Sequence, residues 1–197
     1  MNGMGRLIFF VGAAGAGKTT LARAVAAKRG AALFDMDTLL RPAAEALMAQ
    51  VGLDPSDRDS AAYKTLCRDL GYRITMDAAL ENVAIGNDAF VIGPFTKELA
   101  DPGWIVAQLD RLGDAAAATD TRVVVVRLRD EDAYRDRIRA RGSELDRWKL
   151  TNWGEFSKSL APRQPKWDLP TGSILYIDNT APSAQDNIER IERFIYE

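Results

Sequence analysis

One octet constrains this chain more than any other feature. Residues 12–19 read Gly-Ala-Ala-Gly-Ala-Gly-Lys-Thr, and they match at every position the pattern of a glycine, four residues of any type, and Gly-Lys-Thr. The glycines can take positive φ values, so consecutive backbone N–H groups can form a concave nest for a phosphate. In this pattern the Lys18 ammonium lies between the β- and γ-phosphates, and the Thr19 hydroxyl binds the Mg²⁺ that bridges them. The predicted contacts to a nucleoside triphosphate are Gly12, Ala13, Ala14, Gly15, Ala16, Gly17, Lys18, Thr19 and Thr20.

The segments on either side of the octet fit the same interpretation. Residues 7–11 form a continuous apolar run, which is typical of a buried parallel strand. Gly30 can end a helix that starts at the loop and has apolar residues at helical spacing: Leu21, Ala22, Val25 and Ala26. Such a helix points its free N-terminal N–H groups and its dipole at the bound anion.

Strands and helices alternate along the rest of the chain. Because strands separated by helices pair in parallel, the pattern predicts a three-layer α/β/α P-loop NTPase fold with a five-stranded parallel sheet. We expect one domain over residues 1–197, with a helical substrate-binding insertion at 38–88 and a lid at 130–170, both beyond the carboxyl ends of the strands. The further strands are expected at 31–34, 89–93, 123–128 and 174–177, and the further helices at 42–52, 60–87, 104–112, 131–141 and 183–196.

Two details of the helical insertion are predicted from local signals. Pro42 is well suited to the first turn of a helix, where its missing N–H costs nothing. In the next helix the apolar stripe is expected to run along Leu66, Leu70, Ile74 and Ala78.

Composition excludes several classes of protein. A formal charge of −2 and a pI near 5.4 argue against a nucleic-acid backbone or an anionic membrane as the main partner. No histidine is present, so imidazole bases and His metal sites are excluded, and the single Cys67 is expected to pack in a helix. No apolar stretch has membrane-spanning length and no cleavable apolar segment precedes the first strand, so we expect a cytoplasmic protein without a membrane partner.

Two acids leave the second predicted strand at its carboxyl end, beside the phosphate loop. Phosphoryl transfer to a hydroxyl needs an acid that accepts or orients the proton and another that supports the metal, and Asp35 and Asp37 could divide these roles. The alternative is helix capping, because Asp37-Thr38 precedes an apolar pair and aspartate is a favoured N-cap.

At this point the chain resembles the P-loop small-molecule kinases of the shikimate and gluconate kinase group. In that group a paired-acid motif also follows the second strand, at the separation from the loop lysine that Asp35 has from Lys18. The resemblance implies ATP and Mg²⁺ as cofactors. It also implies that Asp35 supports the magnesium shell and that Asp37 contacts the substrate hydroxyl.

The third predicted strand ends in the sequence Gly-Pro-Phe-Thr-Lys at 93–97. It resembles the Ser-Pro-aromatic turn of adenylylsulfate kinases and occupies the place of a glycine substrate loop in shikimate kinases, which implies substrate contacts from Gly93, Pro94 and Phe95. An ordinary turn is the alternative. No acid ends this strand and no Asn-Lys-x-Asp motif is present, which argues against motor-type ATPases and signalling GTPases.

Basic residues concentrate between residues 130 and 149. In P-loop kinases this position is the lid, whose arginines neutralise charge that builds on the γ-phosphate. Arg137 and Arg141 are the catalytic candidates because they lie four apart on one helical face, with Arg147 behind them and Gly142 as a possible hinge. The alternative for each arginine is a solvated ion pair with one of the neighbouring acids.

Two further positions are implied by the same resemblance. Shikimate kinases place an anion-binding arginine on a helix comparable to 60–87, which suggests that Arg68, Tyr72 and Arg73 face the acceptor, with Arg73 as the candidate. A surface pair with Asp77 is the alternative for Arg73. Asn179 follows the fifth strand, where relatives form the loop that contacts adenine.

The function expected from these residues is a Mg-ATP-dependent kinase that phosphorylates a hydroxyl of a small molecule, either a metabolite or an antibiotic. Chloramphenicol phosphotransferases and zeta-type toxins share the same skeleton, so a drug or a nucleotide sugar is also a possible acceptor. The alternatives are a polynucleotide 5′-hydroxyl kinase and a non-enzymatic ATP-binding regulatory module. The residues imply no particular oligomeric state.

Overall fold

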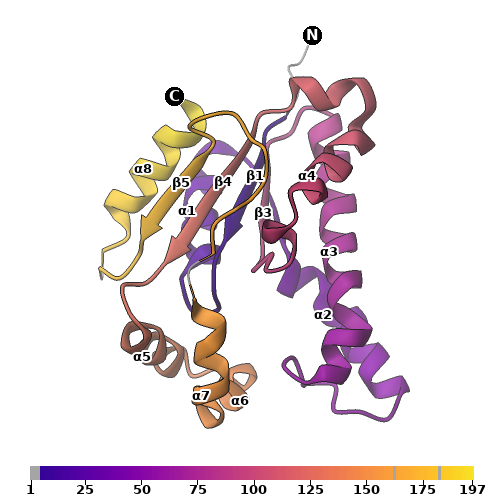
Figure 1. Ribbon diagram of the computed structural model, residues 1–197, viewed down its shortest axis with the longest axis vertical. Coiled ribbons are helices and arrows are strands. Elements are labelled where there is room, and N and C mark those ends of the chain that lie inside the picture. Colours follow the sequence, from indigo (N-terminus) through magenta and orange to yellow (C-terminus); the bar gives the residue numbers. More distant parts are fainter. Residues whose placement is uncertain (1–4, 162, 182) are drawn as a thin grey trace.

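The computed structural model describes residues 5–161, 163–181 and 183–197. Residues 1–4 and 162, which belong to the predicted domain and lid, lie outside this set. Five parallel strands form one sheet in the order β2-β3-β1-β4-β5 (Figure 1). The predicted α/β fold with a five-stranded parallel sheet is therefore confirmed. The strands are β1 (Leu7–Val11), β2 (Ala32–Asp35), β3 (Ala89–Ile92), β4 (Thr121–Arg127) and β5 (Ile174–Asp178).

Helices cover both faces of the sheet because its central strand is apolar at every position. Successive side chains of a strand point to opposite faces. Phe9 therefore packs in a core with residues of α3 (Ala61–Ala84) and α4 (Pro102–Leu109), whereas Phe10 packs in a second core with residues of α1 (Lys18–Arg29) and α8 (Gln185–Tyr196). Both phenylalanines are fully buried. The sheet is thus the middle one of three layers.

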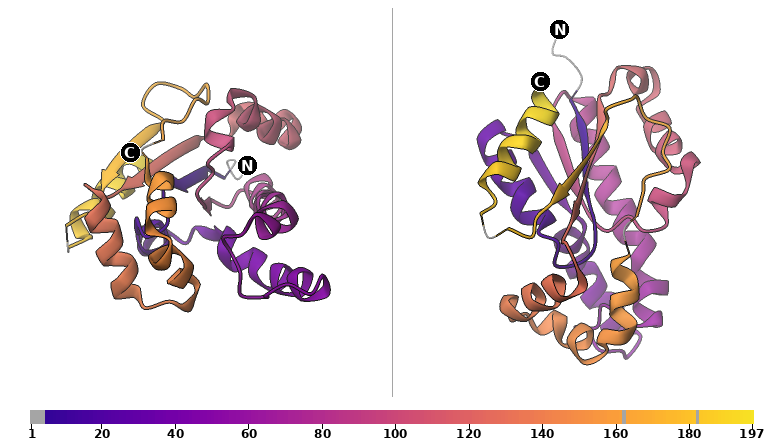
Figure 2. Two further views of the ribbon diagram at one scale, coloured as in Figure 1. Left: turned by 60° about the horizontal axis from the view of Figure 1, so that its bottom comes forward. Right: turned by 60° about the vertical axis from the view of Figure 1, so that its left-hand side comes forward.

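The remaining helices gather beyond the carboxyl ends of the strands (Figures 1 and 2). There α2 and the first turns of α3 lie on one side and α5, α6 and α7 on the other. The α-helices of this region are α2 (Met36–Gln50), α5 (Glu131–Arg141), α6 (Arg147–Thr151) and α7 (Trp153–Phe156). Short 3₁₀ helices complete the elements at Glu98–Ala100, Asp110–Ala118, Glu144–Asp146 and Ser157–Leu160.

The start of α2 differs from the prediction. Asp35 caps this helix, since its side chain accepts a hydrogen bond from the backbone N–H of Asp37. The helix therefore begins at Met36, directly after β2, and Pro42 lies inside it rather than at its start. Elsewhere the ends move by a few residues: α3 ends at Ala84, α8 begins at Gln185, and the helix predicted at 104–112 is α4 followed by a 3₁₀ run.

The predicted apolar stripe of α3 is wrong by one residue. Leu66 is 41% exposed, and the buried face instead includes Cys67, Gly71 and Tyr72, which confirms a packed Cys67. Gly71 allows α2 to approach closely, because a Cβ atom there would lie 2.7 Å from Leu40 Cδ2. A shift of one residue turns a helix face by about 100°. The helix packs on both α2 and the sheet, so its buried surface is wider than one stripe.

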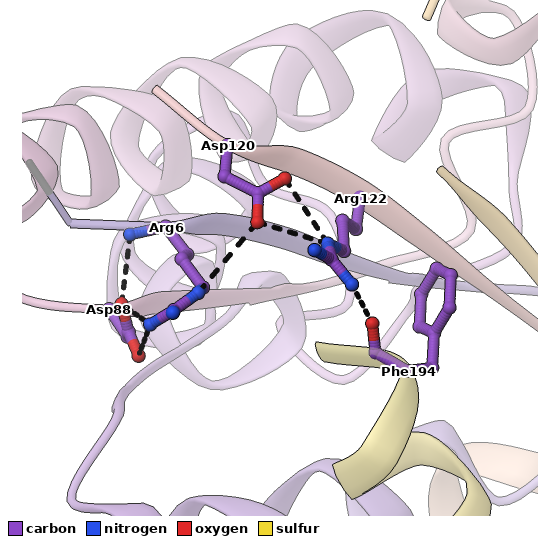
Figure 3. Close-up of polar contacts among 5 residues, drawn as sticks. All are labelled: Arg6, Asp88, Asp120, Arg122 and Phe194. Atoms are coloured by element: carbon purple, nitrogen blue, oxygen red, sulfur yellow. Dashed lines mark hydrogen bonds and ion pairs between the residues drawn. The ribbon is translucent and has the colours of Figure 1, made fainter. Parts of the chain in front are cut away.

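The amino-terminal end of the sheet is held by a network of arginines and aspartates (Figure 3). The backbone N–H of Arg6 donates to Asp88 Oδ1 at 2.9 Å, and its guanidinium pairs with Asp88 at 3.2 Å and with Asp120 at 3.7 Å. Arg122 pairs with Asp120 at 3.0 Å and donates to the carbonyl oxygen of Phe194 in α8. The network joins the strands to α8 at the end opposite the phosphate loop.

Candidate active site

The backbone of the phosphate loop has the conformation that its glycines were predicted to permit. Gly12, Gly15 and Gly17 have φ values of 140°, 85° and 95°. Gly12 also lies against β4, because a Cβ atom there would be 2.1 Å from the carbonyl oxygen of Val126. Side chains at these positions would strain the backbone or collide with a strand. The loop leads directly into α1, whose first residue is Lys18.

Lys18 is held inside the loop and is partly removed from water. Its Nζ donates to the carbonyl oxygen of Ala13 at 2.9 Å. Burial lowers the pKa of Lys18 to about 8; the negative charges of Asp37 and Asp35 oppose this shift, and the positive charge of Arg141 adds to it. Lys18 therefore lies within electrostatic reach of both predicted acids and of one lid arginine.

The affinity for Mg-ATP is expected to fall as the pH rises above about 8. Below its pKa of about 8, Lys18 already carries the charge that a triphosphate requires. Above it, binding must first take up a proton, so affinity falls about tenfold per pH unit until the pKa in the complex is reached. Calorimetry with a non-hydrolysable ATP analogue between about pH 7 and pH 9.5 measures this. The Lys18→Arg variant, which keeps its charge, should lack the step; a pH-independent affinity in the wild type would contradict the expectation.

Thr19 and Asp35, the predicted metal ligands, are in contact. The Thr19 hydroxyl donates to Asp35 Oδ2 at 2.8 Å, while Asp35 Oδ1 accepts from the backbone of Asp37 at 3.1 Å. One carboxylate thus caps α2 and joins it to the phosphate loop. A hydroxyl and a carboxylate are oxygen ligands of the kind that Mg²⁺ takes. Among the described residues no group of three or more His, Cys, Asp or Glu could hold a metal ion.

A cavity of about 990 Å³ lies over the loop and extends between α2, α3, α5 and α6. It brings together most of the predicted site residues. Those that line it are Ala14, Gly15, Gly17, Lys18, Thr19, Thr20, Asp35, Asp37, Gly93, Pro94, Arg137 and Arg141. The predicted residues that do not line it are Gly12, Ala13, Ala16, Arg73, Phe95 and Asn179.

The two favoured lid arginines have different partners. Arg137 donates to the carbonyl oxygen of Ala16 at 3.3 Å and to that of Asn179 at 2.7 Å, so its guanidinium lies against the phosphate loop. Arg141 reaches the cavity from the next turn of α5, and its Nε donates to Asp146 at 2.7 Å. Arg147 instead pairs with Glu144 on the surface and does not line the cavity.

The buried side chain of Asn179 packs against the phosphate loop and holds it by a hydrogen bond. Its Nδ2 donates to the carbonyl oxygen of Ala16 at 2.9 Å, and a Cβ atom on Gly17 would lie 2.4 Å from the same nitrogen. The side chain is buried, so the loop rests on it. A direct contact of Asn179 with the nucleotide stays a prediction.

The turn after β3 presents only part of its predicted contacts to the cavity. Gly93 and Pro94 line the cavity, but the ring of Phe95 is fully buried and packs against Phe9 and Tyr72. The backbone of Phe95 has a φ of 45° and its N–H donates to the Tyr72 hydroxyl at 3.0 Å. Phe95 therefore anchors the turn from inside the core.

Arg73 is not brought to the cavity. Its side chain is 80% exposed and lies 3.8 Å from Asp77, as the alternative interpretation expected. Arg68 lines the cavity, with its guanidinium bound by Glu98 at 2.7 and 2.9 Å. Helix α3 therefore presents Arg68, and not Arg73, to the cavity.

Several lining residues were missed by the sequence analysis. Arg41 lies one helical turn after Asp37, a spacing that would have identified it had α2 been predicted to begin at Met36. The others come from the α2–α3 connection, from α3, from the turn after β3 and from the segment that follows α5, and the sequence analysis assigned none of them to the site. They include Arg58, Asp59, Tyr63, Lys64, Lys97, Asp146 and Lys149.

Comparisons with known proteins agree with this geometry. A family model described as an AAA domain matches residues 7–162. Solved structures similar in fold include a putative kinase from Chloroflexus aurantiacus J-10-fl (TM-score 0.67, 15% identity, 98% of this chain and 97% of that one). A gluconokinase from Sinorhizobium meliloti 1021 (0.56, 14%, 98% and 97%) is similar too. A third is an APS kinase from Mycobacterium tuberculosis in complex with AMPPNP and APS (0.55, 17%, 99% and 99%). No curated protein matches the sequence significantly.

The family match begins at the first residue of β1 and includes the phosphate loop, both acids and the lid arginines. The structural neighbours extend over the whole length, including α8. The resemblance to P-loop kinases seen in the sequence is thus confirmed at the level of the fold. The chain belongs to the AAA domain family and has the α/β fold of P-loop kinases.

Proposed function

We propose that this protein is a Mg-ATP-dependent kinase that transfers the γ-phosphoryl group to a hydroxyl of a small molecule. The observation that carries the proposal is the convergence, in one cavity, of Lys18, the bonded pair Thr19–Asp35, and Asp37. Arginines from α5 approach the same place. A donor site, a proton acceptor and groups that neutralise charge are the parts that phosphoryl transfer requires.

The residues suggest a division of roles. The acceptor hydroxyl oxygen attacks the γ-phosphorus, the bond to the β,γ-bridging oxygen breaks and ADP leaves, while the hydroxyl proton passes to the carboxylate of Asp37. Lys18, Arg137 and Arg141 stabilise the negative charge on the phosphoryl oxygens. Thr19 and Asp35 would hold Mg²⁺, which neutralises charge on the phosphates when bound. Asp37 suits its role because it is exposed to the cavity in the first turn of α2.

The acceptor is expected between Asp37, the Gly93-Pro94 turn and the first turns of α3. A cavity of about 990 Å³ is at the upper end of small-ligand sites, which suits a nucleotide together with a small acceptor. The net charge of −2 disfavours a polynucleotide. No helix in the described part of the chain is both long and apolar enough to span a bilayer. We place the enzyme in the cytoplasm, where Mg-ATP is supplied.

A labelled-product screen tests the proposal. The protein is incubated with γ-labelled ATP and a metabolite library, and labelled products are identified by mass spectrometry. We expect at least one hydroxyl compound to gain a phosphoryl group, in a reaction that requires added Mg²⁺. ATP binding without a labelled metabolite would support the regulatory-module alternative instead. Label on the 5′ ends of oligonucleotides, with steep salt dependence, would support the polynucleotide kinase.

A further inference from the structure

Four charged side chains of alternating sign connect the phosphate site to the α2–α3 connection. Arg141 Nε donates to Asp146 Oδ2 at 2.7 Å. Lys149 Nζ lies 3.2 Å from Asp146 Oδ1 and 3.4 Å from Asp59 Oδ2. Three of these residues belong to the lid region, whereas Asp59 lies just before α3, on the other side of the cavity. The Lys149–Asp59 pair therefore joins the lid to the helices that flank the expected acceptor site.

Burial distinguishes three of these four charges from an ordinary surface ion pair, whereas the side chain of Arg141 is 50% exposed. The side chains of Asp146, Lys149 and Asp59 are 1%, 12% and 17% exposed. Exposed pairs contribute little, but charges removed from water depend on their partners, and the loss of one partner leaves the other uncompensated. Asp59 is also fixed in place, since its backbone N–H donates to Asp57 Oδ1 at 2.9 Å. The Lys149–Asp59 contact thus joins α6 to a connection whose backbone is itself fixed by a hydrogen bond.

Arg141 is the member of this series of charges that lies nearest the phosphate site, where the chemistry would occur. It lines the cavity, and its positive charge helps to lower the pKa of Lys18. Its guanidinium is oriented by Asp146, which is held in turn by Lys149. The position of Arg141 therefore depends on whether the lid is docked on the α2–α3 connection.

We propose that Asp59, Lys149 and Asp146 form a latch that places Arg141 for phosphoryl transfer when the lid meets the acceptor-binding helices. This inference rests on the proposed kinase function. Asp59, Lys149 and Asp146 are positioning residues in it, because they act through Arg141. The latch makes the stabilisation of phosphoryl charge depend on the state of the acceptor site. It predicts a loss in kcat rather than in ATP affinity, since Lys18 and Thr19 stay in place.

A double-mutant cycle tests the latch in the full-length protein. Asp59→Asn and Lys149→Met are each expected to lower kcat at least roughly tenfold, and the double variant is expected to lose no more than Lys149→Met alone, because that variant already lacks the contact with Asp59. The KM for ATP should change by less than about threefold. Lys149→Arg should restore most of the activity, and Lys158→Met, at an exposed lid-region lysine, should leave it unchanged. Losses that multiply in the double variant, or that appear in KM alone, would overturn the proposal.

Hydrogen exchange of the ligand-free protein separates the latch from the kinase function. Backbone amides of residues 143–152 should exchange at least roughly tenfold faster in Asp59→Asn and in Lys149→Met, and no faster in the double variant than in Lys149→Met. Amides of β1 should be unaffected, which excludes global destabilisation. Unchanged exchange in the lid would overturn the latch whatever the kinase assay gives. Exchange that changes as expected, in a protein that phosphorylates no acceptor, would reject the kinase function and retain the lid contact.

Discussion

Replacing Lys18 with alanine is expected to lower kcat/KM for phosphoryl transfer by about 10³-fold. Lys18 is the one basic side chain of residues 12–19, and Arg137 beside the loop already donates to the carbonyl oxygens of Ala16 and Asn179. Preorganised groups aimed at developing charge contribute about 10²- to 10³-fold each in water-excluded sites. Lys18 acts on both the bound nucleotide and the transferred group, so the loss should appear in ATP affinity as well as in kcat.

The measurement is steady-state kinetics of ADP release with saturating acceptor, together with calorimetry of nucleotide binding. Lys28→Ala is the matched control, because Lys28 lies in the last turn of the same helix and pairs at the surface with Glu192. That variant should retain wild-type kinetics. A loss of less than about tenfold in Lys18→Ala would mean that the octet does not hold the transferred phosphate in the way proposed.

Replacing Asp37 with alanine is expected to lower kcat by about 10²- to 10⁴-fold, the range of a positioned general base. ATP affinity should stay within a few fold, because the contact between the loop and the acids is made by Thr19 and Asp35. Asp37 contributes its backbone N–H to the cap of α2, and alanine keeps that group. The fold should therefore be unaffected by the change.

Kinetics over a range of acceptor concentrations separates the two effects, with nucleotide binding measured on the same samples. Glu45→Gln is the matched control: Glu45 is an acid further along α2 that pairs with Arg58 and does not line the cavity. Full turnover in Asp37→Ala would show that another group takes the proton. A large loss of ATP affinity would show instead that Asp37 belongs to the nucleotide site.

The sequence predicted those parts of the site whose conformation depends on residues close together in the chain. The loop conformation follows from Gly12, Gly15 and Gly17, and the strand before it and the helix after it carry apolar residues at the right spacing. The meeting of Asp35 with Thr19 could be anticipated because parallel strands end at one edge of a sheet.

The parts that were missed depend on contacts between distant segments or on the phase of a helix. The buried face of α3 was predicted one residue out of phase, and Arg73 was chosen where the structure places Arg68. Helix α2 begins earlier than predicted, at the cap Asp35, so Arg41 was not recognised as a residue of this helix facing the cavity. No local pattern indicates that Asn179 supports the loop. Nothing near Lys149 in the sequence predicts its pairing with Asp59, because α6 and the α2–α3 connection meet only in the folded chain.

In the proposed reaction a phosphoryl group passes from ATP to a hydroxyl within the cavity, and ³¹P NMR follows this transfer without a coupled assay. The γ-phosphate of ATP is followed in the presence of the protein, Mg²⁺ and a metabolite pool. We predict that a phosphomonoester signal grows in step with ADP, and that it is absent with Lys18→Ala and strongly reduced with Asp37→Ala. The appearance of inorganic phosphate alone, or no turnover of ATP with any acceptor, would contradict the claim.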